Sequence, residues 1–129
     1  MTHSEHFEPT VFIVDDDQNI LLALRFLLEA EDLTVETYVS AQAFLDRYDS
    51  TRPGCLLLDL RMPGMNGLEL QEILAARGVH LPIIIITGQG DKLMMLQALD
   101  AGAIDVFQKP FDYEALVKRI HQAIAGDIE

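Results

Sequence analysis

Short apolar runs that end abruptly in a polar residue recur along this chain, and they constrain its fold more than any other feature. Four runs share this pattern: residues 11–14 before Asp15, 55–58 before Asp59, 83–86 before Thr87, and 106–107 shortly before Lys109. Brief apolar runs separated by helical stretches are typical of strands in a parallel sheet that is buried on both faces. The pattern therefore predicts an α/β protein.

Strands and helices are expected to alternate along the whole sequence. The predicted strands lie near residues 10–14, 34–38, 55–58, 83–86 and 105–107. The predicted helices lie near residues 19–29, 41–48, 67–77, 91–101 and 112–125. Five consecutive strand–helix units favour a doubly wound, five-stranded parallel sheet in the flavodoxin-like order 2-1-3-4-5, with helices on both faces. We expect one domain over residues 1–129, with its core at about residues 10–125.

The composition fits a small acidic globular domain. Half of the 129 residues are hydrophobic, and 21 acidic residues outnumber 9 basic residues, for a net charge of −12. This charge argues against direct binding of nucleic acid or of an anionic membrane surface by this domain. No apolar stretch approaches the roughly 20 residues that a membrane-spanning helix needs. The single cysteine, Cys55, lies within an apolar run, which predicts a buried thiol and a reducing, cytoplasmic location.

The predicted topology brings several of the polar residues together. Ligands of doubly wound sheets bind at the carboxyl ends of the strands, where the strand order reverses, here between the first and third strands. Asp15, Asp16 and Asp59 follow those two strands. Two such charges 4 Å apart repel by about 4 kcal/mol at an effective dielectric constant of 20. We therefore expect a site for a divalent cation and a phosphoryl group.

Five features of the sequence, the acids among them, resemble the response-regulator receiver domain of two-component signalling. The shared features are the acidic pair after the first strand, Asp59 after the third, the Met-Pro-Gly-Met-Asn-Gly loop at 62–67, Thr87 after the fourth strand, and Lys-Pro-Phe at 109–111. The similarity covers about residues 10–125. The stretches at 59–63 and 87–91 are most similar to receivers that precede a helix-turn-helix output domain, often of the LuxR type.

The resemblance implies a role for each polar residue. Asp59 matches the phosphoacceptor, which receives a phosphoryl group from a sensor histidine kinase. The implied cofactor is Mg²⁺, with four implied ligands: Asp15 through a bound water, Asp16, Asp59 and the backbone carbonyl of Arg61. Lys109 matches the cation that pairs with Asp59, and Thr87 matches the hydroxyl that bonds the phosphoryl group. The Lys109–Pro110 bond is expected to be cis. The domain is then a signalling module that catalyses its own phosphorylation and dephosphorylation, not an enzyme for separate substrates.

One position departs from the family pattern. The aromatic residue that commonly couples to the threonine is replaced by Val106, and the neighbouring Phe107 is expected to face the opposite side of the sheet. A switch based on loop and helix displacement is therefore expected. The resemblance also implies a phosphorylation-promoted homodimer through helix 91–101 and strand 105–107.

Two other functions compete with the receiver interpretation. A flavodoxin-like nucleotide binder would carry a neutral, glycine-rich loop after the first strand, where this chain has three aspartates. A phosphatase with an aspartyl nucleophile would carry a second acid at the position of Arg61.

Asp17 is interpreted as a solvated acid or as a partner of the helix dipole. Ser40 and Asp112 are predicted N-caps, and Gly67 is expected to allow a tight approach to the next helix.

Overall fold

The computed structural model describes residues 8–88 and 90–126, and within them five strands alternate with five helices. The strands are β1 (Thr10–Val14), β2 (Thr34–Tyr38), β3 (Gly54–Leu58), β4 (Ile83–Thr87) and β5 (Asp105–Gln108). The helices are α1 (Gln18–Glu29), α2 (Ala41–Arg47), α3 (Gly67–Ala76), α4 (Lys92–Asp100) and α5 (Tyr113–Ala125). Every predicted segment corresponds to one of these elements. Gln89, in the predicted link between β4 and α4, and residues 1–7 and 127–129 of the predicted domain lie outside the described residues.

All strand pairs are parallel, and the order β2-β1-β3-β4-β5 is the one predicted. In the register, Val14 at the end of β1 lies opposite Leu58 at the end of β3. The residues that follow, Asp15 and Asp59, therefore leave the sheet at the same level. This register brings together acids that are 44 positions apart in the chain.

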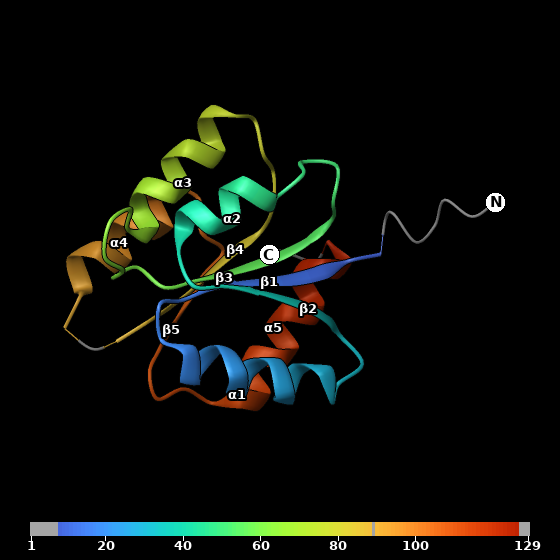
Figure 1. The fold of residues 1–129 in the computed structure, drawn as a ribbon. Helices are drawn as coiled ribbons and strands as arrows, with labels where there is room; N and C mark the ends of the chain where they lie inside the picture. Colours follow the sequence, from blue (N-terminus) through green and yellow to red (C-terminus); the bar gives the residue numbers. More distant parts are fainter. Residues whose placement is uncertain (1–7, 89, 127–129) are drawn as a thin grey trace.

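The helices form one layer on each face of the sheet (Figure 1). Helices α1 and α5 cover one face, and α2, α3 and α4 cover the other. Successive β1 residues alternate between the two layers, with Ile13 in the core against α1 and α5 and Phe12 in the opposite core. Val106 and Phe107 also point to opposite faces, as predicted: Phe107 packs on the α1–α5 side and Val106 on the other. In the described part of the chain, no helix is both long and apolar enough to cross a bilayer.

Side-chain caps begin four of the five helices in the described residues. The capping side chains accept hydrogen bonds from first-turn N–H groups and belong to Asp17, Ser40, Asn66 and Asp112. The caps at Ser40 and Asp112 were predicted. Asp17 has a more specific role than predicted, because its carboxylate accepts from the backbone N–H of Asn19 and fixes the start of α1.

Gly67 stands where the start of α3 touches the end of β3. A Cβ atom at this position would lie 2.5 Å from the carbonyl oxygen of Asp59 and 2.9 Å from the Cα atom of Leu60. Both atoms belong to the backbone, so neither can move without displacing the chain after β3. The close approach predicted for this glycine is confirmed.

We expect Gly67→Ala to destabilise the domain by about 1–3 kcal/mol, because overpacking against backbone forces the structure to shift. The control is Gly88→Ala, since no described atom beyond its chain neighbours lies within 4 Å of a Cβ there. Urea unfolding followed by circular dichroism measures both changes. Equal stability of the two variants would show that α3 can move away from β3 at little cost.

Candidate functional site

Three carboxylates meet at the carboxyl edge of the sheet. Asp15, Asp16 and Asp59 each place one carboxylate oxygen within 4.8 Å of the others. Asp15 and Asp59 are buried, and Asp16 is exposed. Backbone hydrogen bonds fix the two buried residues, because Asp59 N–H donates to the Val14 carbonyl at 3.0 Å and Asp15 N–H donates to the Tyr38 carbonyl at 3.2 Å. The structure thus brings together the acids predicted from the sequence.

Lys109 supplies a positive charge from the loop after β5. Its Nζ atom lies 3.0 Å from Oδ2 of Asp15 and 4.0 Å from Oδ2 of Asp59. The ammonium group was predicted to pair with Asp59, but its shorter contact is with Asp15. Its backbone N–H donates to the carbonyl of Thr87 at 2.7 Å, and this bond ties the loop to the end of β4. The Lys109–Pro110 peptide bond is cis, as predicted.

Even with Lys109 nearby, the cluster disfavours a negative charge on Asp59. Burial, and then the neighbouring charge of Asp15, raise the pKa of Asp59 to about 6, although Lys109 acts in the opposite direction. One ammonium group thus compensates only part of the charge of three carboxylates. A cluster in this state favours a bound cation.

The donor set fits Mg²⁺. Hard divalent cations prefer oxygen ligands, and Mg²⁺ commonly binds one or two carboxylates and retains several waters. The carboxylates of Asp15, Asp16 and Asp59 are the protein groups that could hold it. The backbone carbonyl of Arg61, the fourth predicted ligand, belongs to the loop that leaves the cluster directly after Asp59.

Thr87 ends β4 at the same edge of the sheet. Its side chain is fully buried, and its Oγ1 atom has no hydrogen-bond partner among the described residues. Buried hydroxyl groups are nearly always hydrogen-bonded. The Thr87 hydroxyl is therefore available to a polar group that enters the site.

Arg61 makes two contacts that the sequence did not predict. Its backbone N–H donates to Oδ1 of Asp59 at 3.4 Å. Its side-chain Nε lies 2.7 Å from both carboxylate oxygens of Asp91, and Nη2 also contacts this carboxylate. These hydrogen bonds to Arg61 lower the pKa of Asp91. The pair spans 30 positions of sequence, and the only available signal was that neighbouring strands precede both residues.

Backbone N–H groups in the loop after β1 and at the start of α1 are already bonded to nearby carboxylates. The N–H of Asp17 donates to Oδ1 of Asp15 at 2.9 Å, and the N–H of Asn19 donates to Oδ1 of Asp17 at 2.9 Å. A nucleotide-binding loop instead directs free N–H groups toward phosphate. This geometry counts against the nucleotide-binding alternative.

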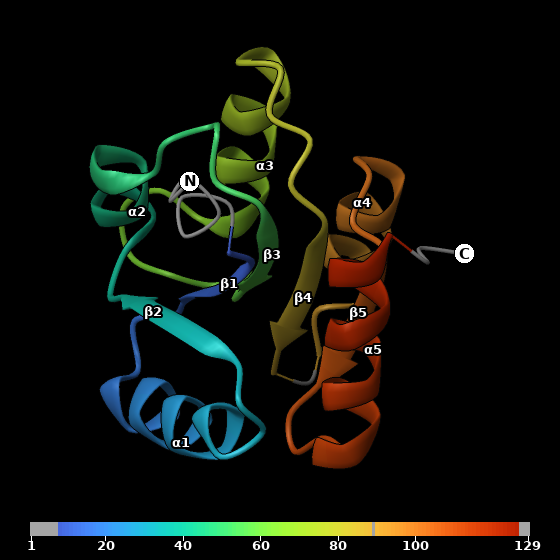
Figure 2. The same ribbon diagram turned by 90° about the vertical axis from the view of Figure 1, so that its right-hand side faces the viewer.

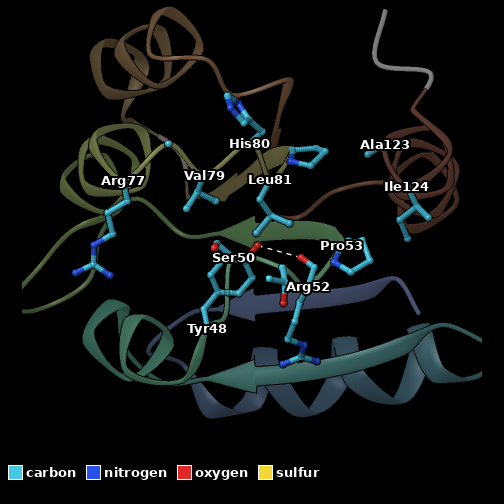
Figure 3. Close-up of a pocket in the computed structure, with 14 residues that line it drawn as sticks. Tyr48, Ser50, Arg52, Pro53, Arg77, Val79, His80, Leu81, Ala123 and Ile124 are labelled. Atoms are coloured by element: carbon cyan, nitrogen blue, oxygen red, sulfur yellow. Dashed lines mark hydrogen bonds between the residues drawn. The ribbon is translucent and has the colours of Figure 1, made fainter. Parts of the chain in front are cut away.

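A cavity lies at the opposite, amino-terminal edge of the sheet (Figure 3). Its volume is about 460 Å³, and its basic lining residues include Arg52, Arg77 and His80. The guanidinium group of Arg52 is bound to the carboxylate of Glu36 and lies over the ring of Phe12, 5.0 Å from its centroid. The side chains of Arg52 and Arg77 extend in different directions (Figure 3). This cavity therefore lacks the convergent polar groups found at the acidic cluster.

Comparisons with known proteins agree with this geometry. Residues 11–121 match the model of the response regulator receiver domain. The chain is 45% identical over 122 residues to the response regulator protein TmoT of Ectopseudomonas mendocina, covering 95% of this chain and 56% of that protein. It is 40% identical over 119 residues to the transcriptional regulatory protein FixJ of Azorhizobium caulinodans, covering 92% of this chain and 56% of that protein. The chain thus spans little more than half the length of these relatives.

Solved structures show the same similarity. The response regulator StyR superposes with a TM-score of 0.86 at 46% identity, over 92% of this chain and 60% of that chain. The structure of FixJ-N superposes with a TM-score of 0.85 at 39% identity, over 91% of this chain and 94% of that chain. With its strand order, its acidic cluster and these matches, the chain belongs to the response regulator receiver domain family.

Proposed function

We propose that this domain accepts a phosphoryl group on Asp59 from a sensor histidine kinase, in a Mg²⁺-dependent reaction, and that the change alters its surface. The observation that carries the proposal is the cluster of three carboxylates beside Lys109. The relative FixJ is a transcriptional regulatory protein, so we further propose that the output is control of transcription. A cytoplasmic location follows from this role.

The proposed chemistry is a transfer between two nucleophiles. A carboxylate oxygen of Asp59 forms a bond to phosphorus while the bond from phosphorus to the donor nitrogen of the kinase breaks. Bound Mg²⁺ would neutralise the charge that the carboxylates and the phosphoryl oxygens bring together. The ammonium group of Lys109 is close enough to pair with a phosphoryl oxygen after transfer. The unpartnered Thr87 hydroxyl can donate a hydrogen bond to the same group.

The surroundings of Asp59 favour a signalling module over a phosphatase for other substrates. A phosphatase of this chemistry needs a second acid near the position of Arg61 to protonate the leaving group. Arg61 instead donates its side-chain N–H groups to Asp91. We therefore assign to the domain only its own phosphorylation and dephosphorylation.

The surface most suited to a response lies on α4, which packs beside β5 (Figure 2). Three leucines of this helix are exposed: Leu93, Leu96 and, to a smaller extent, Leu99. Met95 and Val106, in the helix and strand expected to form the dimer, are half-buried against the core of the α2–α4 layer. We propose that the exposed leucines form a homodimer contact that phosphorylation promotes.

We expect Asp59→Asn to abolish incorporation of acid-labile phosphate, since the amide cannot replace the nucleophilic carboxylate. Incubation with Mg²⁺ and acetyl phosphate, followed by intact-mass measurement, detects the adduct. Asp46→Asn, an exposed change on α2, is the matched control and should label like the parent. An adduct of one phosphoryl mass on Asp59→Asn would refute the assignment of the acceptor.

Mg²⁺ should raise the melting temperature, because it relieves repulsion in the acidic cluster. Asp16→Ala should remove most of this rise. Asp17→Ala should instead lower stability by about 1 kcal/mol with or without Mg²⁺, since it removes the cap of α1. Thermal melts at several Mg²⁺ concentrations separate the two effects, and an equal loss of the Mg²⁺ response would contradict the ligand assignment.

The rise in melting temperature caused by Mg²⁺ should also depend on pH. The pKa of Asp59 is raised to about 6, so the folded protein holds this proton more tightly than the unfolded chain does. Protonation of Asp59 removes a ligand charge, and the stabilisation by Mg²⁺ should therefore shrink as the pH falls through about 6.

Beryllofluoride, a mimic of the bound phosphoryl group, should shift the protein from monomer toward dimer in analytical ultracentrifugation. Leu96→Asp should prevent the shift by placing a charge in the apolar contact. Leu22→Asp, at a similarly exposed leucine of α1, is the control and should leave the shift unchanged. A parent that stays monomeric at high concentration with beryllofluoride bound would exclude this dimer.

A further inference from the structure

Helix α4 begins differently from the other four helices of the described chain. Asp91 occupies its N-cap position but makes no side-chain hydrogen bond to the first turn. Its backbone angles, φ −109° and ψ 43°, also lie outside the extended region that the other four N-cap residues adopt. Aspartate is among the best N-cap residues, so a competing interaction must hold its carboxylate.

The competing interaction is the ion pair with Arg61. Nε of Arg61 lies 2.7 Å from each carboxylate oxygen of Asp91, and Nη2 binds the same group. The carboxylate side is buried, with 5% of the Asp91 side chain exposed, while 70% of the Arg61 side chain is exposed. The arginine is therefore the partner that can leave the pair without opening the core.

The Arg61–Asp91 pair links the loop after β3 to the start of α4. A groove of about 420 Å³ lies between the loop after β3 and α4, with Met62 and Pro63 on one side and Met94 on the other. The nearest other polar link in the described structure runs from Nε2 of Gln71 on α3 to the carbonyl of Ala98, two turns further along α4. Met62 and Met94 belong to one apolar cluster, and Arg61 supplies the polar part of the contact between the loop and the first turn of α4.

Arg61 also contacts the proposed acceptor, since its backbone N–H donates to Oδ1 of Asp59. A phosphoryl group on Asp59 would introduce up to about two negative charges beside this residue. Guanidinium groups bind phosphoryl oxygens with two parallel hydrogen bonds, which makes such a group a strong competitor for the side chain. The carboxylate of Asp91 also has an alternative partner in the uncapped N–H groups of α4.

We propose that the Arg61–Asp91 pair is a positioning device that keeps α4 uncapped in the unphosphorylated domain. Phosphorylation draws the guanidinium group from Asp91 to the phosphoryl oxygens, and Asp91 then caps α4 and shifts its first turn. The proposal rests on the proposed function of Asp59. It names Arg61 as the residue that carries the new charge to α4, alongside the hydroxyl of Thr87. By linkage, any change that frees Arg61 should favour binding of the phosphoryl group.

Two variants separate this proposal from a static ion pair. Asp91→Asn frees the arginine and retains a capping side chain, so it should tighten beryllofluoride binding by about fivefold. Arg61→Met removes the group that moves, so it should weaken binding by about fivefold. Glu29→Gln, which breaks the exposed Arg25–Glu29 pair on α1, is the control and should leave binding unchanged. Titrations with beryllofluoride in saturating Mg²⁺, followed by fluorine NMR, give the three dissociation constants.

Amide hydrogen exchange provides a readout on α4 itself. The first-turn N–H groups of Leu93 and Met94 should exchange more slowly in Asp91→Asn than in the parent, because the asparagine can cap them. Beryllofluoride should slow the same amides in the parent. Exchange in Glu29→Gln should match the parent at both positions.

Each contrary result has a separate meaning. If both variants change the affinity in the same direction, or leave it unchanged, while the parent binds beryllofluoride, the release of Arg61 is excluded and the role of Asp59 stands. Unchanged exchange at Leu93 and Met94 in Asp91→Asn would exclude the capping step. A parent that does not bind beryllofluoride would overturn the proposed function of Asp59, and the release of Arg61 with it.

Discussion

The crowding of Asp15 against Asp59 is the constraint on which the rest of the site depends. The register of β1 and β3 fixes both backbones, so the two strands cannot separate to relieve the repulsion between the carboxylates. Water cannot screen them fully, because both side chains are buried. The sheet thereby holds the cluster in a state that a cation stabilises and that changes when the charge on Asp59 changes. The position of Lys109, closer to Asp15 than to Asp59, leaves the acceptor only partly compensated.

Much of the fold and the central part of the site could be predicted from the sequence. Apolar runs of four residues specify β1, β3 and β4, and the polar residues that end them mark the edge where parallel strands place their ligands. Local chemistry likewise predicts the caps at Ser40 and Asp112. The prediction that Val106 and Phe107 face opposite layers follows from strand geometry alone, and the two cores confirm it.

The features that could not be predicted depend on side chains choosing among several partners. Asp91 has the residue type of an N-cap, but its carboxylate binds a guanidinium group from a different loop. Lys109 could pair with any acid of the cluster, and the geometry of the loop after β5 places its ammonium group closer to Asp15 than to Asp59. In both cases sequence patterns indicate that charged groups will meet, but the choice of partner depends on tertiary geometry.

The contact at Gly67 makes the surroundings of Asp59 different on the α3 side and on the α4 side. The start of α3 lies directly against the carbonyl of Asp59, with no side chain between them to deform. A displacement of the Asp59 backbone toward α3 would therefore bring backbone atoms into contact. On the side of α4, a groove and an exposed arginine leave room for movement. The two helices that follow neighbouring strands thus differ in their contact with the acceptor loop, with α3 in direct backbone contact and α4 bordering a groove beside it.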